Sequence, residues 1–387
     1  MLGIPYFIIY FEDNMGIQQT LKEQGIDFTI YKIKSFTRIS IINKAVKLVI
    51  DLIYAARLVN RLSPVQAMVC VVESNRLEYA LISILNRKNI NTIVLQWAQT
   101  MPGGNGYYSN RSSKKGLVAM AWNYLKGFMS WLVKKTLRIK YAGTYGTGDA
   151  KFFAVMGEYY MAMFCEQGVS ADKLVLTGHP EHDYLYKLSL KTKSPEFKRT
   201  TLEGFGLDGT MPLWIVAREA VVYFKLVPEE KDKQDICTVL EILSRYHPDV
   251  QIVLKLHPRD VLGYYEFVKE KFPHVIIIHE CDLYKLIAVC DLYISQISST
   301  MMWAITLDKS VISYDFNNQQ GWHYFRNREG IIKVDTPEIL AEKVKDIAEN
   351  GLSNKVYQQY QAAKKRYMVL DGKACERISE LVMQDGR

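Results

Sequence analysis

Short apolar runs alternate with longer amphipathic stretches along most of the chain. In the first half, the runs with the length and the β-branched or aromatic content of strands are residues 5–11, 27–33, 66–73, 91–98, 151–157 and 173–178. Amphipathic patterns typical of helices lie between them, over residues 41–62, 76–86 and 158–167. Short apolar strands separated by helices indicate a parallel sheet that is covered on both faces.

A second alternating series begins near residue 212. Its apolar runs are 212–217, 251–258, 274–280, 283–290, 291–297, 309–316 and 330–335, and its clearest helical patterns are 233–246 and 298–307. Residues 187–209, between the two series, are polar and charged and show no apolar periodicity. We therefore expect an α/β fold with two Rossmann-like domains, residues 1–187 and 210–387, joined by a linker at about 188–209, with the terminal helices packing back on the first domain. In this GT-B architecture, the ligand binds in an interdomain cleft at the carboxyl ends of the strands.

Composition and residue spacing indicate a folded protein without a metal site. Of the 387 residues, 49% are hydrophobic and 23% are charged, which is typical of globular domains. The first residues show neither a basic start nor a small-residue cleavage site, so we expect a cytoplasmic protein. The six cysteines lack CxxC spacing, and no DxD motif or histidine cluster has metal-ligand spacing. We therefore expect neither a metal nor another cofactor.

Positive charge is densest in residues 111–140, in a chain whose formal net charge is +8. Lys126 interrupts the apolar part of this segment, so a membrane-spanning helix is not expected. Trp122, Phe128 and Trp131 fit a helix that lies peripherally on the inner membrane, with lysines at anionic headgroups. An ordinary domain helix with a solvated basic face is the alternative. The basic residues form no reader motif, so nucleic acid is not an expected partner.

Residues with phosphate-binding chemistry follow two strands of the second domain. His257-Pro258-Arg259 come after the strand that contains Lys255, and Ser298-Ser299-Thr300 come after residues 291–297. A helix that begins at Ser298 presents N–H groups and a positive dipole end, and a histidine on the neighbouring strand end is placed to bond the same phosphate. Arg218 and Arg259 are candidates to offset phosphate or carboxylate charge. Helix capping by Ser298 and a structural role for His257 are the alternatives.

These positions carry a family resemblance. The K-x-H-P sequence at 255–258 and the serine pair at 298–299 resemble the C-terminal domain of bacterial GT-B glycosyltransferases of capsule and lipopolysaccharide assembly. That group includes enzymes that use CMP-sialic acid or CMP-Kdo and the CDP-glycerol polymerases. Residues 153–185 resemble the end of the family's N-terminal domain, so the likeness covers roughly 151–377. The resemblance implies a nucleotide-sugar donor, more cytidine-like than uridine-like, contacted by the matching residues Lys255, His257, Pro258, Ser298 and Ser299.

The sequence departs from this family at the expected base. Many relatives have a His-Gly pair after the fourth strand, where this chain has Trp97-Ala98-Gln99-Thr100. The acid or base is therefore sought among carboxylates: Glu158, directly after a strand, and Asp232, in the acidic loop after the first strand of the second domain. Resemblance to retaining β-Kdo transferases implies Asp232 as nucleophile and Glu158 as acid/base of a double displacement. A favourable first-turn glutamate, a solvated surface carboxylate and an inverting transfer with one base are the alternatives.

The expected function is transfer of a sugar, Kdo from CMP-Kdo, to a lipopolysaccharide or capsule glycan acceptor. Glu12 and Asp13, after the first strand, and Gln99 are the residues expected to contact that acceptor. A sugar-nucleotide epimerase or hydrolase on the same fold is one alternative, and a non-catalytic polysaccharide-assembly subunit is another. A requirement for an acceptor separates the transferase from the epimerase or hydrolase. Absence of nucleotide binding would favour the non-catalytic assembly subunit.

Overall fold

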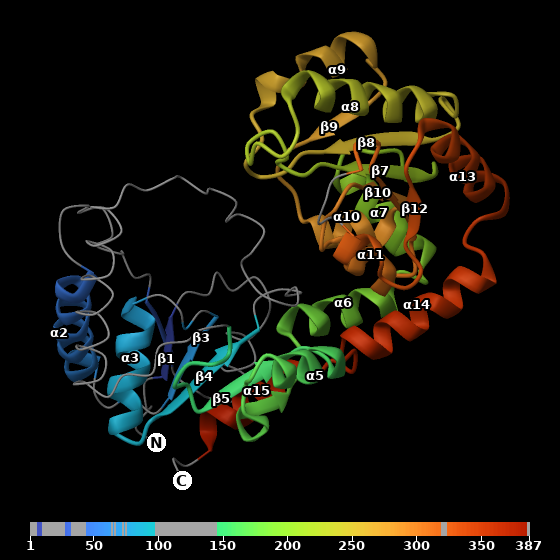
Figure 1. Ribbon diagram of the computed structural model, residues 1–387. Helices are drawn as coiled ribbons and strands as arrows, with labels where there is room; N and C mark the ends of the chain where they lie inside the picture. Colours follow the sequence, from blue (N-terminus) through green and yellow to red (C-terminus); the bar gives the residue numbers. More distant parts are fainter. Residues whose placement is uncertain are drawn as a thin grey trace. The chain divides into compact units, whose positions relative to one another are not determined.

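The computed structural model describes residues 6–9, 28–31, 44–62, 65, 67–71, 73, 76–96, 145–318 and 323–384, and all structural statements concern these residues. The chain forms two compact units. The first comprises Met1–Tyr184 together with Arg366–Arg387, and the second comprises Leu185–Lys365 (Figure 1). Each unit is described by itself.

The first unit is built on a six-stranded parallel sheet with the order β2-β1-β3-β4-β5-β6. Its strands are β1 (Tyr6–Ile9), β2 (Phe28–Tyr31), β3 (Ala67–Cys70), β4 (Asn91–Leu95), β5 (Phe152–Val155) and β6 (Leu174–Leu176). Its helices are α2 (Lys44–Leu62), α3 (Arg76–Arg87), α5 (Glu158–Glu166), the short η2 (Ala171–Lys173) and α15 (Ala374–Met383), and α6 (Pro180–Lys191) begins in it. The alternation of strands and helices predicted from the apolar pattern is confirmed in the described part of this unit.

The last helix of the chain completes the core of the first unit. Ile378, Leu381 and Val382 of α15 pack against apolar side chains of β3 and β4. The carboxylate of Asp183, in α6, accepts the N–H groups of Ala374 at 2.9 Å and Cys375 at 2.8 Å. These bonds satisfy donors that the first turn of α15 leaves without a helical partner. Residues about 190 positions apart in the sequence are therefore fixed together by buried hydrogen bonds.

The second unit has its own six-stranded parallel sheet, with the order β12-β11-β10-β7-β8-β9. Its strands are β7 (Leu213–Ala217), β8 (Gln251–Lys255), β9 (Ile276–Ile278), β10 (Leu292–Ser295), β11 (Ser310–Tyr314) and β12 (Ile332–Val334). Its helices are α7 (Pro195–Gly204), α8 (Glu229–Ser244), the short η3 (Leu262–Tyr265), α9 (Glu266–Lys271), α10 (Leu283–Val289), α11 (Met301–Thr306), α12 (His323–Arg326), α13 (Pro337–Asn350) and α14 (Asn354–Tyr367). Two parallel sheets in succession confirm the predicted fold class.

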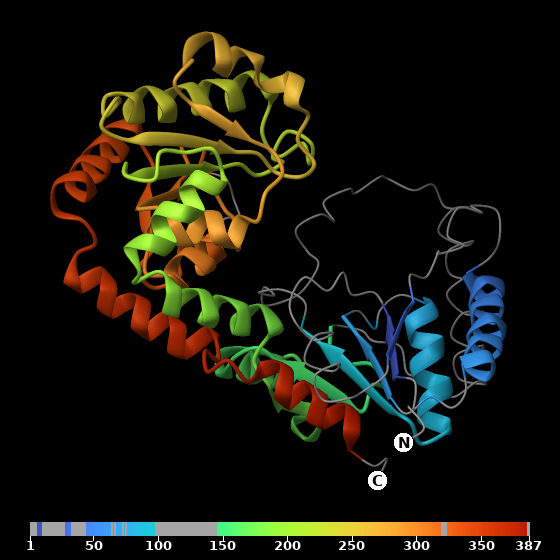
Figure 2. The same ribbon diagram turned by 180° about the vertical axis from the view of Figure 1, so that it is seen from behind.

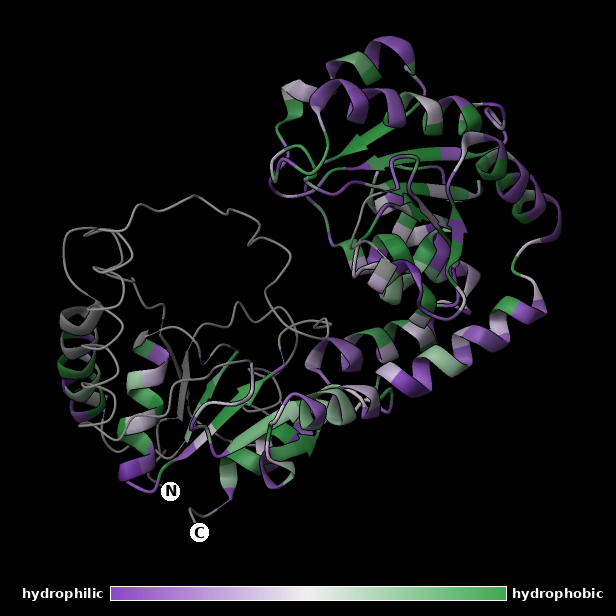
Figure 3. Cartoon of the chain, viewed as in Figure 1, coloured by the Kyte–Doolittle hydropathy of each residue, from purple (hydrophilic) through white to green (hydrophobic). Residues whose placement is uncertain are grey.

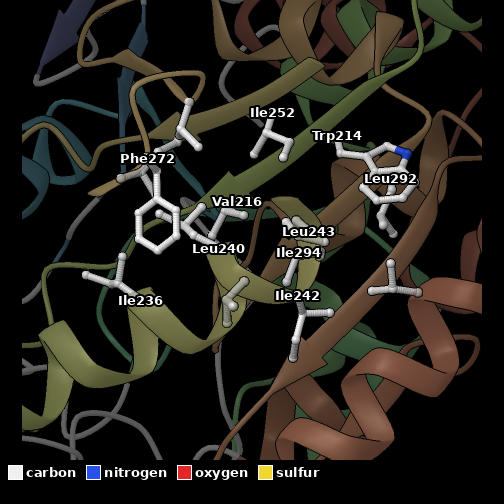
Figure 4. Packing of buried hydrophobic residues seen from close by; sticks show 14 of the residues in the cluster. Trp214, Val216, Ile236, Leu240, Ile242, Leu243, Ile252, Phe272, Leu292 and Ile294 are labelled. Atoms are coloured by element: carbon white, nitrogen blue, oxygen red, sulfur yellow. The ribbon is translucent and has the colours of Figure 1, made fainter. Parts of the chain in front are cut away.

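Both faces of the second sheet are covered, as the nearly continuous apolar strands require. Trp214, Val216 and Ile294 point to the face on which Ile236, Leu240 and Leu243 of α8 pack (Figure 4). Figures 1 and 2 show α8 and α9 on that face and α10 and α11 on the other. In Figure 3 the strands are hydrophobic, while hydrophilic residues gather on α8 and α13. The sheet interior is therefore separated from solvent by amphipathic helices.

Residues 188–209, expected to form a linker without regular structure, are largely helical. They contain the end of α6 and all of α7. Ser194 caps α7 by accepting the N–H of Phe197 at 3.3 Å, and Pro195 stands at the first helical position. Leu202 is the one buried residue of this helix, which is why α7 shows no periodic apolar pattern in the sequence.

The apolar run 283–290 also differs from its expected strand. It forms helix α10, whose first turn is capped by Asp282, which accepts the N–H of Lys285 at 3.1 Å. Residues 286–289 are all buried. Because this helix is short and buried on several sides, its apolar pattern is continuous and resembles that of a strand.

Candidate functional site

Three neighbouring strands of the second unit carry the predicted donor-binding residues at their carboxyl ends. Strand β7 lies between β10 and β8, with Val216 paired to Ile294 and Ala217 paired to Lys255. Arg218 therefore follows the central strand, His257 follows one neighbour and Ser298 follows the other. The structure brings these residues to one edge of the sheet. It also corrects the expectation that His257 and Ser298 follow adjacent strands, because β7 separates them by two strand spacings, or roughly 10 Å.

The loop after β8 holds His257 in a defined protonation state. The backbone N–H of His257 donates to Asp260 Oδ2 at 2.9 Å, and His257 Nδ1 accepts the backbone N–H of Arg259 at 3.1 Å. Burial lowers the pKa of His257, which favours the neutral ring. A neutral imidazole that accepts at Nδ1 carries its hydrogen on Nε2. His257 is therefore prepared to donate one hydrogen bond from Nε2.

The other residues of the K-x-H-P sequence have different roles in the structure. Lys255 is buried, and its ammonium donates to the carbonyl oxygens of Leu256 at 2.6 Å and His279 at 2.9 Å. Burial lowers the pKa of Lys255. Pro258 and Arg259 are exposed, and the Arg259 guanidinium lies 5.0 Å from the ring centre of Phe224. Lys255 thus orders the strand end, whereas Arg259 stands at the surface beside it.

The loop after β10 presents a group of linked hydroxyls. Ser298 Oγ lies 2.7 Å from Thr300 Oγ1, which lies 2.5 Å from the Tyr293 hydroxyl. Ser298, Ser299 and Thr300 are all half-buried. Helix α11 begins at Met301 rather than at Ser298 and has only 6 residues, so the expected helix-dipole contribution is small. The hydroxyls themselves are the donors that this loop offers.

Arg218 and Asp232 form a buried ion pair. Arg218 Nη2 donates to Asp232 Oδ1 at 2.5 Å, and the two side chains are each 1% exposed. The Tyr264 hydroxyl donates to Asp232 Oδ2 at 3.0 Å, and Arg218 Nη1 donates to the Tyr314 hydroxyl at 3.1 Å. Burial and the Asp232 carboxylate raise the pKa of Tyr264. Both carboxylate oxygens and the two terminal nitrogens of the guanidinium are therefore hydrogen-bonded within the protein.

This environment corrects the expected location of Asp232. Asp232 lies in the first turn of α8 and not in a surface loop, because α8 begins at Glu229. The acidic residues there suit a helix amino terminus. With its carboxylate buried against Arg218, Asp232 offers no exposed oxygen for attack on a donor sugar, and Arg218 offers no exposed guanidinium. The nucleophile role of Asp232 stays a prediction without geometric support.

Glu219 was missed in the sequence, although it directly follows Arg218. Its carboxylate accepts the Ser295 hydroxyl and the backbone N–H groups of Gln296 at 3.2 Å and Ile297 at 3.3 Å. Burial raises the pKa of Glu219, and the hydrogen bond from Ser295 opposes that rise. Its position two residues past the predicted end of a strand was the available signal. The carboxylate stands beside the loop that carries Ser298.

In the first unit, Glu158 is the described catalytic candidate. It is the first residue of α5, soon after β5, as expected from the sequence, and its side chain is exposed. Glu12, Asp13, Gln99 and the basic segment 111–140 lie outside the described residues. Glu73, after β3, was not considered. It is fully buried and accepts the N–H of Gly148 at 3.0 Å, so it anchors a loop.

No group of three or more histidine, cysteine, aspartate or glutamate side chains is arranged to hold a metal ion in the part of the chain that the structure describes. Within the same residues, no helix has both the length and the apolar character needed to span a bilayer.

Several solved structures share the fold of this chain at low sequence identity. No protein-family model and no curated protein matches the chain. The wall teichoic acid polymerase TagF is similar in structure, with a TM-score of 0.61 and 13% identity over 99% of this chain and 88% of TagF. The UDP-GlcNAc 2-epimerase of Neisseria meningitidis has a TM-score of 0.58 and 12% identity, over 98% of this chain and 99% of the epimerase. The corresponding epimerase of Methanocaldococcus jannaschii has a TM-score of 0.57 and 14% identity, over 98% and 99%. The chain therefore shares the two-unit GT-B-type fold of these proteins.

Proposed function

We propose that this protein is a glycosyltransferase that binds the phosphate of a nucleotide-activated sugar at the carboxyl edge of the second unit's sheet. The observation that carries the proposal is the set of donors on one edge: the Nε2 hydrogen of His257 after β8, and the hydroxyls of Ser298 and Thr300 after β10. The similar structures support a nucleotide-sugar ligand, because two of them were solved with UDP-GlcNAc.

The geometry suggests how such a donor is divided between the two loops. His257 and Ser298 are on strands separated by β7, so one phosphate cannot contact both backbones at once. We assign the phosphate to the hydroxyl loop and a more distant part of the donor, or a second phosphate, to His257. Neutral donors of this kind stabilise negative charge that develops on a departing phosphate.

The reaction that we propose is displacement at the anomeric carbon. An acceptor hydroxyl forms the new carbon–oxygen bond while the bond to the phosphate oxygen breaks, and the phosphate leaves with the electron pair. The hydroxyl proton passes to a base, for which the exposed Glu158 remains our candidate. We favour a single base over a double displacement, because the Asp232 carboxylate is buried in its ion pair. The donor to try first is CMP-Kdo, on the resemblance of the K-x-H-P and serine motifs.

An epimerase is the second candidate, because two of the similar structures are UDP-GlcNAc 2-epimerases. An epimerase converts the nucleotide sugar without an acceptor, whereas a transferase releases nucleotide only when an acceptor is present. Incubation of the protein with UDP-GlcNAc alone, followed by separation of the nucleotide sugars, therefore distinguishes the two reactions.

Calorimetric titration with CMP, CDP and UDP tests the proposed site. We expect binding of a cytidine nucleotide that weakens at least tenfold in His257→Ala, since the Nε2 donor is lost. His274→Ala is the matched control. His274 is also half-buried, and its Nε2 lies 2.8 Å from the Ser244 hydroxyl. Because His274 precedes β9 whereas His257 follows β8, the two histidines lie at opposite edges of the parallel sheet. Equal loss in both variants, or no binding of any nucleotide, would refute the proposed site, and preference for UDP would favour the epimerase.

A further inference from the structure

The turn after β10 already holds an anion, which is the carboxylate of Glu219. This carboxylate accepts from the Ser295 hydroxyl and from the N–H groups of Gln296 and Ile297, which are the donors immediately before Ser298. A turn that directs successive N–H groups to one anion is a common site for phosphate oxygens. Here the protein places its own carboxylate in that position.

A second observation at the same turn indicates unused binding capacity. The side chain of Gln296 is fully buried, and its Oε1 atom accepts from Arg218 Nη1 at 3.4 Å. Its Nε2 atom is buried and has no hydrogen-bond partner among the described residues. A buried amide donor without an acceptor is costly and rare in folded proteins. The turn thus combines an occupied anion position with an unsatisfied donor.

Glu219 is surrounded by groups that only partly balance its charge. Arg218 is the nearest cation, but its guanidinium is already paired with Asp232. Tyr293 of β10 and Tyr314 of β11 also face Glu219, and burial together with the Glu219 charge keeps both phenols neutral by raising their pKa. Burial likewise raises the pKa of Glu219 itself. A further negative charge near this carboxylate would therefore meet little compensation.

We propose that Glu219 is a positioning residue that takes up a proton when the donor phosphate binds at Ser298–Thr300, so that phosphate affinity depends on the protonation of this carboxyl. The inference deepens the proposed function and rests on it. A phosphate oxygen that accepts from Ser298, one residue beyond Ile297, lies roughly 6 Å from the carboxylate, since consecutive Cα atoms are about 3.8 Å apart. At that separation, each phosphate charge raises the pKa of the carboxyl further, because a like charge disfavours the ionised form.

The proton balance of this step is simple. The free protein has the Glu219 carboxylate on the turn. On binding, a proton from solvent forms the O–H of the carboxylic acid, which removes the negative charge that would otherwise repel the phosphate. On release of the nucleotide the proton returns to solvent. No redox partner or cofactor takes part.

The test is calorimetric titration of the full chain with CMP near pH 6.5, in buffers with different ionisation enthalpies. The dependence of the observed enthalpy on the buffer gives the protons taken up. CMP has its own phosphate ionisation near pKa 6, so the quantity to compare is the difference between wild type and Glu219→Gln. We expect extra uptake of a fraction of a proton in the wild type, and at least tenfold tighter CMP binding by Glu219→Gln at pH 8, where the wild-type carboxylate is charged.

Two further variants make the result decisive. Ser295→Ala removes the hydroxyl that lowers the pKa of Glu219, so the loss of CMP affinity with rising pH should move to higher pH. Glu349→Gln, on the exposed surface of α13, should match the wild type. If CMP binds all variants with equal proton uptake and pH dependence, the role of Glu219 is refuted while the proposed site stands. If CMP binds none of them, the proposed function itself fails.

Discussion

Replacement of Asp232 separates a structural ion pair from a catalytic nucleophile. In Asp232→Asn, the side chain keeps its shape, but the Arg218 guanidinium is left charged in a position where both side chains are 1% exposed. In the wild type, the Tyr264 hydroxyl donates to Oδ2 of Asp232. In the variant, the amide nitrogen faces that hydroxyl and cannot accept this hydrogen bond. Removal of one partner of a buried pair costs about 3–5 kcal/mol. That is a large fraction of the roughly 5–15 kcal/mol that stabilises an ordinary domain.

The same reasoning predicts rescue by an apolar pair. Arg218→Met combined with Asp232→Leu removes both charges together, and such replacements are commonly neutral or stabilising. The double variant should therefore recover most of the stability lost in Asp232→Asn. Hydrogen exchange of peptides from β7 and α8 in rising urea reads the stability of this region directly, which matters because a chain with two units need not unfold in one step.

The result that would refute the ion-pair reasoning is clear. If Asp232→Asn kept the exchange protection of β7 and α8 and lost only turnover, Asp232 would act on the substrate, and the double displacement would return as the mechanism. If the variant lost protection and the double variant regained it, the carboxylate would be a structural partner of Arg218. Nucleotide binding by the double variant would then show whether the buried charge of Arg218 contributes to the site.

Other parts of the structure give three further predictions. Ser194→Ala removes the cap of α7 and should cost about 0.5–2 kcal/mol in urea denaturation, whereas Ser194→Gly should cost only a few tenths; equal losses would contradict a capping role. Asp183→Asn weakens the two buried bonds to the first turn of α15, so exchange protection of α15 should fall while that of α13 is unchanged. His179 is buried, and burial lowers its pKa to about 4, below the ordinary value of 6.5, so the neutral ring stabilises the fold above pH 6.5 and this contribution is lost as the pH falls from about 6.5 to 4. The loss should approach about 1.4 kcal/mol per pH unit, and urea midpoints measured over this range should show a shallower slope in His179→Gln.

The sequence was most informative where local pattern and tertiary position coincide. Continuous apolar strands predicted two parallel sheets, and the carboxyl ends of parallel strands meet at one edge, so His257 and Ser298 were placed correctly on that edge. Their order across the sheet was not predictable from spacing, because β7 inserts between strands that follow it in the chain.

Errors arose where a residue's role depends on a partner in another element. The acidic residues around Asp232 have a composition typical of a surface loop, and only the packing of α8 beside β7 shows that this carboxylate is paired with Arg218. Glu219 was passed over for the same reason, because its hydrogen-bond donors lie on β10 and the turn after it. Long-range hydrogen bonds of this kind leave no periodic signal in the sequence.

The position of α15 has a consequence for the order in which the protein folds during synthesis. Helix α15 supplies Ile378 and Leu381 to the core on β3 and β4, yet it is made after every residue of the second unit. The second sheet can therefore close while the first still exposes Val69 and Ile93 to solvent or to chaperones. A chain truncated before residue 374 should therefore aggregate through its first unit and not through its second.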